Sequence, residues 1–386
     1  KHTYLGFLTR GSSGEDRPDS GPTLMRRIVG KSQIAFDSPL YHRGEAQFRD
    51  NLAVLLERYR NARIPVFIGT LASNEKDLVP FASGLAQETD VAAWRRSFKT
   101  GVDALLGGDT DLAGTSLEAA LALDNSAASA HFALGRLFES QGEYSAARDA
   151  YLEARDRDQL RFRAPRRFNR VIREVAAQQG AQVVEVEASL LDHATHGIIG
   201  NELMLEHLHP NLDGYFLLAD AYYRALLDAG IPGSAVQAVS REQAWSELPV
   251  TAVDLKKADY EIMRLTADWP FRTDGTRPHY PDRNGEIEQL AYSLFTRGMA
   301  WSKATEQLQA YYLQRQNTLA AARVAVLLAD AYSYDTERQY QANQLAQDAG
   351  LVQDAARLLR RALQQSPVRE LDAAVSTDSS GTDRHN

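Results

Sequence analysis

The 386-residue sequence lacks cysteine and contains no apolar run of about 18 residues, the length needed to cross a membrane. Without cysteine the chain can form no disulfide bond and offers no thiolate metal ligand. Basic residues are outnumbered, with 43 against 51 acidic residues, and the net charge is −8. We therefore expect neither a transmembrane segment nor a general nucleic-acid-binding surface.

The beginning of the sequence also lacks familiar features. Lys1 comes first, with neither an initiator methionine nor a signal-peptide pattern. We interpret the chain as a processed or truncated piece of a longer protein. The composition is ordinary for a globular protein, with 44% hydrophobic and 24% charged residues, and the length allows two or three domains.

Two short apolar segments, residues 64–69 and 180–186, predict strands of a parallel sheet. Segments with helical periodicity lie around them, at 43–62, 166–179 and 211–229. The order of helix, strand, inserted helices, helix, strand and helix predicts the last part of a parallel α/β sheet that is interrupted by other helices.

An internal repeat with a period of 34 residues runs through residues 94–161. Seven positions match across this period, and small residues recur where paired helices would cross. The period is typical of tetratricopeptide (TPR) repeats, which are pairs of helices that lean on their neighbours for stability. The matching pairs are Phe98 and Phe132, Gly101 and Gly135, Gly108 and Gly142, Ala113 and Ala147, Leu117 and Tyr151, Ala120 and Ala154, and Asp124 and Asp158.

The loop at residues 200–211 holds a candidate catalytic pair. Glu206 lies three residues before His209, a spacing that lets a carboxylate orient an imidazole as a general base. In the alternative interpretation, Glu206 is an acidic residue at a helix entry and His209 is a surface residue before a proline, because this spacing is common.

A metal site is the rival interpretation of the same region. His193, His196, His207 and His209 are close in sequence, and neutral imidazoles bind zinc readily. However, an irregular loop gives their rings no common direction, and no acidic triad accompanies them. We therefore expect solvated loop histidines, with no metal and no cofactor.

Two other groups of polar residues are candidates for binding. Ser73 and Asn74 follow the first predicted strand, where they could donate to a developing oxyanion or simply form a turn that ends the strand. The basic run at residues 161–167 could hold an anionic substrate or solvate the start of a helix. We favour solvation for this run.

Taken together, these segments resemble SGNH/GDSL-type hydrolases that carry TPR repeats inserted in the hydrolase domain. The last matching block contains Glu206 and His209 followed by proline, with glutamate where the family has aspartate. The resemblance implies that His209 is the general base toward a serine nucleophile and that Glu206 orients it. His196, in the adjoining block, is assigned to substrate binding with Ser73 and Asn74. The resemblance spans about residues 25–228, and the matching segments are 37–41, 69–75, 162–165, 196–202 and 206–210.

The sequence departs from this family in one large respect. No Gly-Asp-Ser sequence occurs anywhere in the chain, so the nucleophilic serine of the family is missing and is expected before residue 1. Our first hypothesis is the C-terminal portion of a serine hydrolase that acts on an ester-type or acylated substrate and docks a protein partner through its repeats. The alternative is a catalytically inactive TPR scaffold on a vestigial hydrolase core. By itself, the chain is expected to be inactive.

The predicted fold is a partial three-layer, flavodoxin-like α/β core with inserted and appended α-helical TPR-like repeats. Residues 1–10 are a candidate for a further strand. The predicted order is an α/β segment at 1–90, two repeats at 91–161, the end of the α/β domain at 162–230, an irregular linker at 231–285, TPR-like helices at 286–367 and a disordered tail at 368–386.

Overall fold

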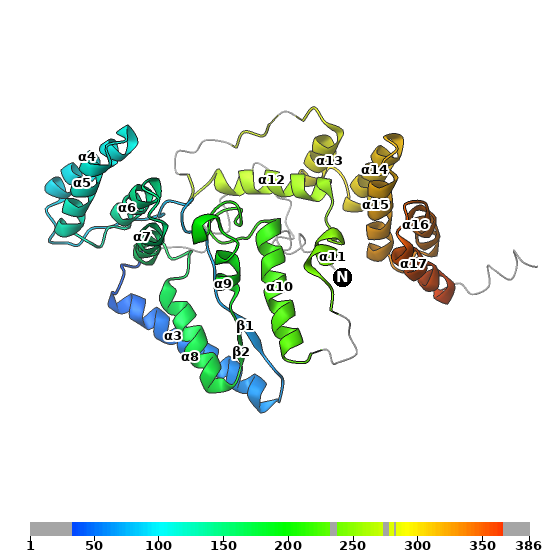
Figure 1. The fold of residues 1–386 in the computed structure, drawn as a ribbon, viewed down its shortest axis with the longest axis horizontal. Coiled ribbons are helices and arrows are strands. Elements are labelled where there is room, and N and C mark those ends of the chain that lie inside the picture. Colours follow the sequence, from blue (N-terminus) through cyan, green and yellow to red (C-terminus); the bar gives the residue numbers. More distant parts are fainter. Residues whose placement is uncertain (1–32, 232–237, 273–277, 282, 366–386) are drawn as a thin grey trace, which may run out of the picture. The chain divides into compact units, whose positions relative to one another are not determined.

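A computed structural model describes residues 33–231, 238–272, 278–281 and 283–365 (Figure 1). The chain divides into two compact units. We call the first the site unit; it comprises Leu24–Ser246 and Trp269–Phe271. The second, the C-terminal unit, comprises the described residues of the segments Glu247–Asp268 and Arg272–Asn386. The strand predicted at residues 1–10 and the tail predicted at 368–386 lie outside the described residues.

The site unit is built mainly from helices. Its elements in chain order are α3 (Pro39–Asn61), β1 (Phe67–Gly69), α4 (Val91–Gly107), α5 (Thr110–Leu123), α6 (Ala128–Ser140), α7 (Tyr144–Arg157), α8 (Arg166–Gln179), β2 (Gln182–Val184), α9 (Val186–Leu191), the 3-10 helix η1 (Thr195–Gly197), α10 (Leu212–Asp228) and α11 (Arg241–Ser246).

The predicted three-layer α/β core is wrong. Across the described ranges the chain forms fifteen α-helices and two strands, and β1 pairs in parallel with β2 in one small sheet. Each strand has only three residues, so each is shorter than the apolar segment that predicted it. Pro65, which has no N–H for a ladder, stays outside β1, and the chain enters α9 at Val186. The fold is mainly α-helical, and the resemblance to SGNH/GDSL hydrolases is not supported.

The two strands join two groups of helices inside the site unit. Side chains alternate between the faces of a strand. Ile68 and Val183 pack with buried residues of α3 and α8. Phe67 and Val184 pack with buried residues of α9 and α10. The sheet therefore acts as a local bridge between helical layers and places the loop after β1 near the loop before α10.

Helices α4 to α7 form two hairpins whose repeated positions pack in the same way. In the first hairpin, a Cβ added to Gly101 would lie 2.7 Å from Leu117 Cγ. In the second, a Cβ added to Gly135 would lie 2.7 Å from ring atoms of Tyr151. Both large side chains are buried, so each glycine admits a bulky residue at the helix crossing. The 34-residue period thus repeats a packing contact as well as a residue type.

The glycine at the second crossing provides a stability test. We expect Gly135→Ala to destabilise the hairpin of α6 and α7 by about 1–3 kcal/mol, because the new methyl group would overlap the buried Tyr151 ring. Gly114→Ala is the matched control, since a Cβ there meets only Leu137 Cδ2, at 3.6 Å. The control is expected to be neutral or to stabilise by up to about 1 kcal/mol through helix propensity. Chemical denaturation of both variants measures the difference, and equal midpoints would refute the packing argument.

Within its described part, the C-terminal unit contains helices joined by short connections and no strand. Its core surrounds the fully buried Tyr260 and includes Leu290, Phe295 and Leu308. Helix α12 begins with a capping box, in which Thr251 and Asp254 bond each other's backbone N–H groups. The helices of this unit are α12 (Ala252–Thr266), α13 (Glu286–Phe295), α14 (Trp301–Gln314), α15 (Thr318–Ala331), α16 (Thr336–Asp348) and α17 (Val352–Gln365). Helix α12, and α11 of the site unit, lie within residues 231–285, which we predicted to be an irregular linker.

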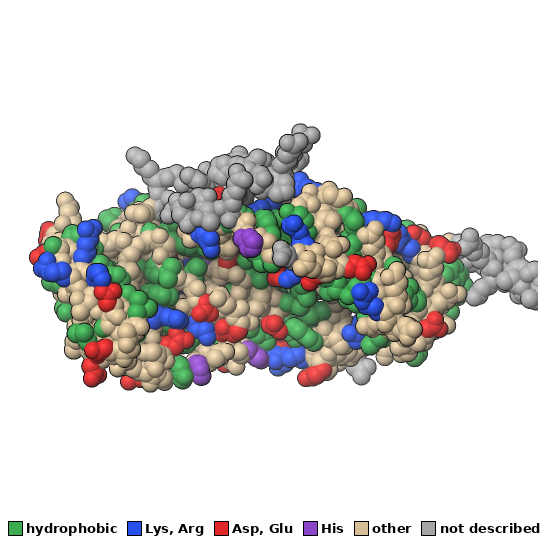
Figure 2. All heavy atoms as spheres, turned by 90° about the horizontal axis from the view of Figure 1, so that it is seen from above, with side chains coloured by type: hydrophobic (Ala, Val, Ile, Leu, Met, Phe, Trp, Pro, Cys, Tyr) green, Lys and Arg blue, Asp and Glu red, His purple; other side chains and the backbone are tan. Residues whose placement is uncertain are grey.

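None of the helices in the described ranges combines the length and the apolar character that a membrane crossing requires. On the face of the molecule shown in Figure 2, basic and acidic side chains are interspersed between hydrophobic and neutral ones. Charge on this face is therefore mixed in sign.

Candidate functional site

The candidate catalytic loop of the site unit folds back on itself. Met204 and Pro210 form an antiparallel bridge, and Leu205 N donates a hydrogen bond to His209 O at 2.8 Å. Asn211 N donates to the carbonyl oxygen of Leu203 at 2.9 Å. These backbone bonds close the neck of the loop and hold its tip, residues 205–209, in one conformation.

Helix α10 starts directly after this loop and clamps it. Asn211 caps the helix, and its side-chain oxygen accepts a hydrogen bond from Gly214 N at 3.0 Å. Gly214 lies so close to the loop that a Cβ would come within 2.2 Å of Leu203 O. The loop therefore rests on the first turn of a long helix, which gives the tip a rigid support.

Glu206 and His209 make the contact that their spacing predicted. Glu206 Oε1 accepts a hydrogen bond from His209 N at 2.8 Å and also contacts His209 Nδ1. The carboxylate has no proton to donate, so Nδ1 must carry one, and Nε2 is then the basic nitrogen of the ring. Nε2 forms no hydrogen bond within the described ranges. The carboxylate thus sets both the orientation and the tautomer of His209.

A second histidine shares the same carboxylate. Glu206 Oε2 accepts a hydrogen bond from His207 N at 2.7 Å and also contacts His207 Nδ1. His207 is buried against the rings of Phe81, Phe162 and Phe271, with centroid distances of 5.3 to 5.8 Å. Burial, together with smaller contributions from the neighbouring His209 and Arg163, lowers the pKa of His207 to about 3, so this ring is neutral at ordinary pH.

The two histidines consequently differ in what they can do. The His209 side chain retains 32% of its exposure, whereas that of His207 retains 2%. Partial burial also lowers the pKa of His209, which keeps its ring deprotonated near neutral pH. His209 therefore combines an oriented ring, a free basic nitrogen and access to solvent. The sequence pattern did not distinguish the structural role of His207, which depends on aromatic residues far away in the chain.

Ser73 and Asn74 lie beside this loop, and their polar atoms are engaged within the protein. Asn74 N donates to His207 O at 3.0 Å, and the Asn74 amide nitrogen donates to Asn201 Oδ1 at 2.8 Å. Ser73 Oγ accepts a hydrogen bond from Arg155 Nη1 at 3.3 Å. Both residues are buried. The structure thus brings them next to the catalytic loop in supporting contacts, and their binding of substrate stays a prediction.

The next residue, Glu75, connects the loop after β1 to the helical hairpins. Its buried carboxylate accepts two hydrogen bonds from Arg148 of α7, both at 3.1 Å, and lies 4.0 Å from Arg155 Nη1. Its backbone N donates to Ile199 O at 2.8 Å. Burial raises the pKa of Glu75, and the two arginines oppose that rise. The sequence analysis did not identify this cluster. Arg148 and Arg155 are seven residues apart and therefore share a helix face, which is the feature of the sequence that could have indicated it.

The basic run at residues 161–167 contains a buried member, so the interpretation of the run as purely solvating is wrong. Arg163 is 3% exposed. One of its nitrogens pairs with Asp158 Oδ2 at 3.1 Å, and another donates to Asn74 O at 3.1 Å. Asp158 itself accepts hydrogen bonds from the backbone of Phe81 and Ala82. Arg163 thereby fastens the loop after β1 to the end of α7.

The other loop histidines occupy separate environments. His193 bonds Ser189 O and Arg241 Nη1, each at 2.8 Å. His196 has a positive φ of 60° and stacks on Tyr144 of α7, with ring centroids 3.7 Å apart. Within the described ranges no group of three or more histidine, aspartate or glutamate side chains is placed to hold a metal ion. The role of His196 in substrate binding stays a prediction.

Comparison of the sequence with models of known protein families gives no match, and comparison with curated proteins finds no relative. The functional argument therefore rests on the geometry of the site unit.

Proposed function

We propose that Glu206 and His209 form an acid–base pair that promotes hydrolysis of an ester-type or acylated substrate. The observation that carries this proposal is the double contact from one carboxylate oxygen of Glu206 to the backbone and ring nitrogens of His209. It holds the ring with Nε2 unprotonated and without a described partner, as a general base requires.

In the proposed reaction His209 Nε2 takes a proton from an attacking water molecule, so hydrolysis does not require the serine whose absence led us to expect an inactive chain. The imidazolium that forms is stabilised by Glu206, whose buried carboxylate lies against Nδ1. The proton then passes from Nε2 to the leaving oxygen, which returns His209 to its starting state. The cluster of Glu75, Arg148 and Arg155 takes no part in proton transfer and keeps the loop after β1 in place.

The dependence of hydrolysis on pH tests the proposal. A base works in its deprotonated form, and burial lowers the pKa of His209 below the ordinary value of about 6.5. We therefore expect the rate of 4-nitrophenyl ester hydrolysis by the full chain to rise with pH under acidic conditions. It should level off once His209 is deprotonated and stay flat through neutral pH.

The matched control for this experiment is His193→Ala, which removes a loop histidine that bonds Ser189 and Arg241 instead of an acidic residue. Its profile should coincide with that of the unaltered chain. A rate that falls as pH rises through this range, or the absence of any hydrolysis above the background, would overturn the proposal.

A second function is favoured by the repeated packing of α4 to α7. Hairpins with equivalent crossings at Gly101 and Gly135 stack into surfaces that hold peptides or partner helices. The tip of the first hairpin also exposes Leu106 and Leu112, at 82% and 46%. A docking role for these helices is compatible with hydrolysis. It would be the main function if the full chain shows no hydrolysis that depends on His209.

A further inference from the structure

A turn that is distant from the catalytic loop in sequence supplies part of the aromatic surroundings of His207. Residues 269–271 form the tip of this turn, and Arg272 N closes it by donating a hydrogen bond to Asp268 O at 3.1 Å. Residues 269–271 belong to the site unit, whereas residues 247–268 before them do not. We call this tip the aromatic turn, because it brings two rings to the site unit as a separate segment.

Both rings of the aromatic turn pack on rings that surround His207. Phe271 has its centroid 5.3 Å from that of His207 and 5.2 Å from that of Phe81. Trp269 lies 5.8 Å from Phe162, whose centroid is in turn 5.8 Å from that of His207. The aromatic turn therefore completes a shell around His207. The other rings of this shell come from the loop after β1 and from the segment between α7 and α8.

The shell matters for the acid–base pair because His207 and His209 share one carboxylate. Glu206 is 4% exposed and accepts hydrogen bonds from His207 N at 2.7 Å and from His209 N at 2.8 Å. Its two oxygens also contact the Nδ1 atoms of the two rings. A cationic His207 would compete for the negative charge that stabilises the imidazolium of His209. The full charge of Glu206 is available to His209 only while His207 stays neutral.

Charged groups face His207 from its own loop and from the segment before α8. Glu206 favours a proton on His207, whereas Arg163 and a protonated His209 disfavour one. Arg163 pairs with Asp158 at 3.1 Å, so part of its charge is balanced. Burial has the largest effect, and it lowers the pKa of His207 to about 3. Since the aromatic shell buries this ring, opening the shell removes the main cause of the low pKa.

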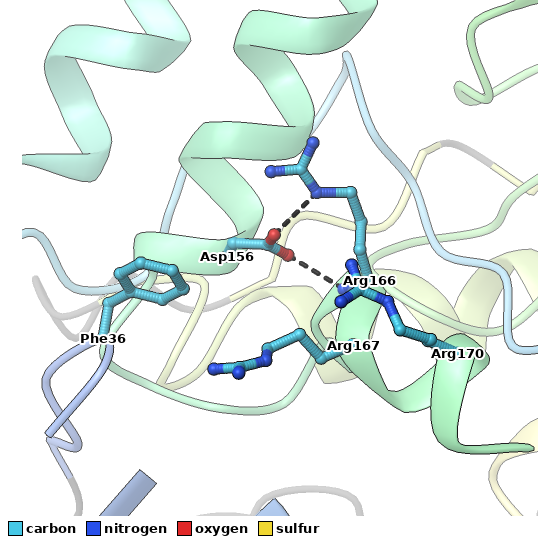
Figure 3. A pocket seen from close by; sticks show the side chains of 5 residues that line it. All are labelled: Phe36, Asp156, Arg166, Arg167 and Arg170. Carbon is cyan, nitrogen blue, oxygen red and sulfur yellow. Dashed lines mark hydrogen bonds and ion pairs between the residues drawn. The ribbon is translucent and has the colours of Figure 1, made fainter. Parts of the chain in front are cut away.

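The aromatic shell is separate from the two cavities that lie along helix α8. The larger cavity, of about 400 Å³, is drawn in Figure 3, where Arg166 meets Asp156 at 2.7 Å. Neither cavity is lined by a residue of the loop 200–211 or by a ring of the shell. Phe271 is thus part of a packed cluster, which fits a role exerted through His207 better than a role in lining either cavity.

We propose that Phe271 is a positioning residue, which closes the aromatic shell around His207 and so reserves the Glu206 carboxylate for His209. The inference rests on the proposed function, in which Glu206 stabilises the imidazolium of His209. Phe271 acts by excluding water from the shared carboxylate. In such a site the attraction between a carboxylate and an imidazolium is stronger than in water.

Titration of His207 by ¹⁵N NMR of the full chain tests the shell without any substrate. In the unaltered chain we expect the ring to stay neutral at about pH 5. In Phe271→Ala water reaches the ring, so its titration midpoint should rise by about two pH units toward the ordinary value of 6.5. About half of the molecules should then carry a protonated His207 at about pH 5. The signal of His207 is assigned by its loss in His207→Gln.

The matched control is Phe48→Ala, which removes a half-buried ring of α3 that packs on Phe168 at 4.6 Å. It should leave the titration of His207 unchanged. Phe271→Leu keeps a large apolar side chain and should shift the midpoint by less than about half a unit. Phe271→Val leaves a smaller gap than alanine and should raise the midpoint by about one unit. It provides the same test if circular dichroism shows that Phe271→Ala does not fold.

The same variants test the effect of Phe271 on hydrolysis. At neutral pH, Phe271→Ala should lower the rate of 4-nitrophenyl ester hydrolysis about three- to tenfold, because water beside the shared carboxylate weakens its attraction for the imidazolium. Phe271→Leu should restore the rate to within about twofold of the unaltered chain, since its side chain still excludes water.

Three results would overturn the inference. The first is a His207 that stays neutral at about pH 5 in both Phe271→Ala and Phe271→Val. The second is an unchanged rate of hydrolysis in Phe271→Ala. The third is an equal loss of rate in Phe271→Ala and Phe271→Leu, which would indicate that the ring contacts the substrate. Hydrolysis that is absent from every chain would instead contradict the proposed function, and the titration of His207 would still decide whether the shell shields this ring.

Discussion

Replacing His209 with alanine is expected to reduce ester hydrolysis by the full chain about 10²- to 10⁴-fold, the contribution of a positioned general base. The substitution removes the basic nitrogen and leaves the neck of the loop, whose bonds are made by the backbone, in place. The remaining Glu206 carboxylate still accepts hydrogen bonds from the backbone of residues 207 and 209. Initial rates with a 4-nitrophenyl ester, measured beside His193→Ala, give the effect.

Glu206→Gln separates orientation from chemistry in the same assay. A glutamine oxygen can still accept a hydrogen bond from Nδ1, but it cannot balance the positive charge of the imidazolium. We therefore expect a smaller loss than for His209→Ala, with its main effect on the turnover rate. Activity of His209→Ala within about twofold of the unaltered chain would exclude His209 as the base.

Replacing Glu75 with glutamine is expected to destabilise the site unit by about 1–3 kcal/mol, because it removes the buried carboxylate that accepts two hydrogen bonds from Arg148 and lies 4.0 Å from buried Arg155. Arg155 is 2% exposed, so water cannot replace the lost partner. Arg155 keeps its other acidic neighbour, Glu187, at the same distance of 4.0 Å, so the main loss falls on the contact with Arg148. Hydrogen exchange measures the change by region, and we expect faster exchange at residues 70–77 and 198–210.

Two controls accompany this experiment. Glu57→Gln makes the same chemical change at an exposed pair with Arg60, 3.7 Å apart, and should alter stability by no more than about 1 kcal/mol. Helices α14 to α17 belong to the C-terminal unit and should exchange at unchanged rates in both variants. Faster exchange in those helices, or no change at residues 70–77, would contradict a role for Glu75 in fastening the loop.

Local helical structure was the most predictable part of this protein. The predicted helix at 166–179 is confirmed as α8, Arg166–Gln179, because its apolar residues recur with helical period and Gly180 ends it with a positive φ. The predicted strands were less reliable. Each apolar segment gives only three paired residues, since pairing requires a partner strand and depends on contacts distant in the chain.

The sequence by itself determined the period of the hairpins and the pairing of Glu206 with His209, because both depend on residues separated by fixed short distances. Tertiary structure alone decided the fold class, the burial of His207 among aromatic rings and the link from Glu75 to Arg148. The rings around His207 include Phe81 and Phe271, which are far apart in the chain. The fold class depends on whether each strand pairs with further strands. A single sequence records which charges are present, but the folded chain decides which of them are buried and paired.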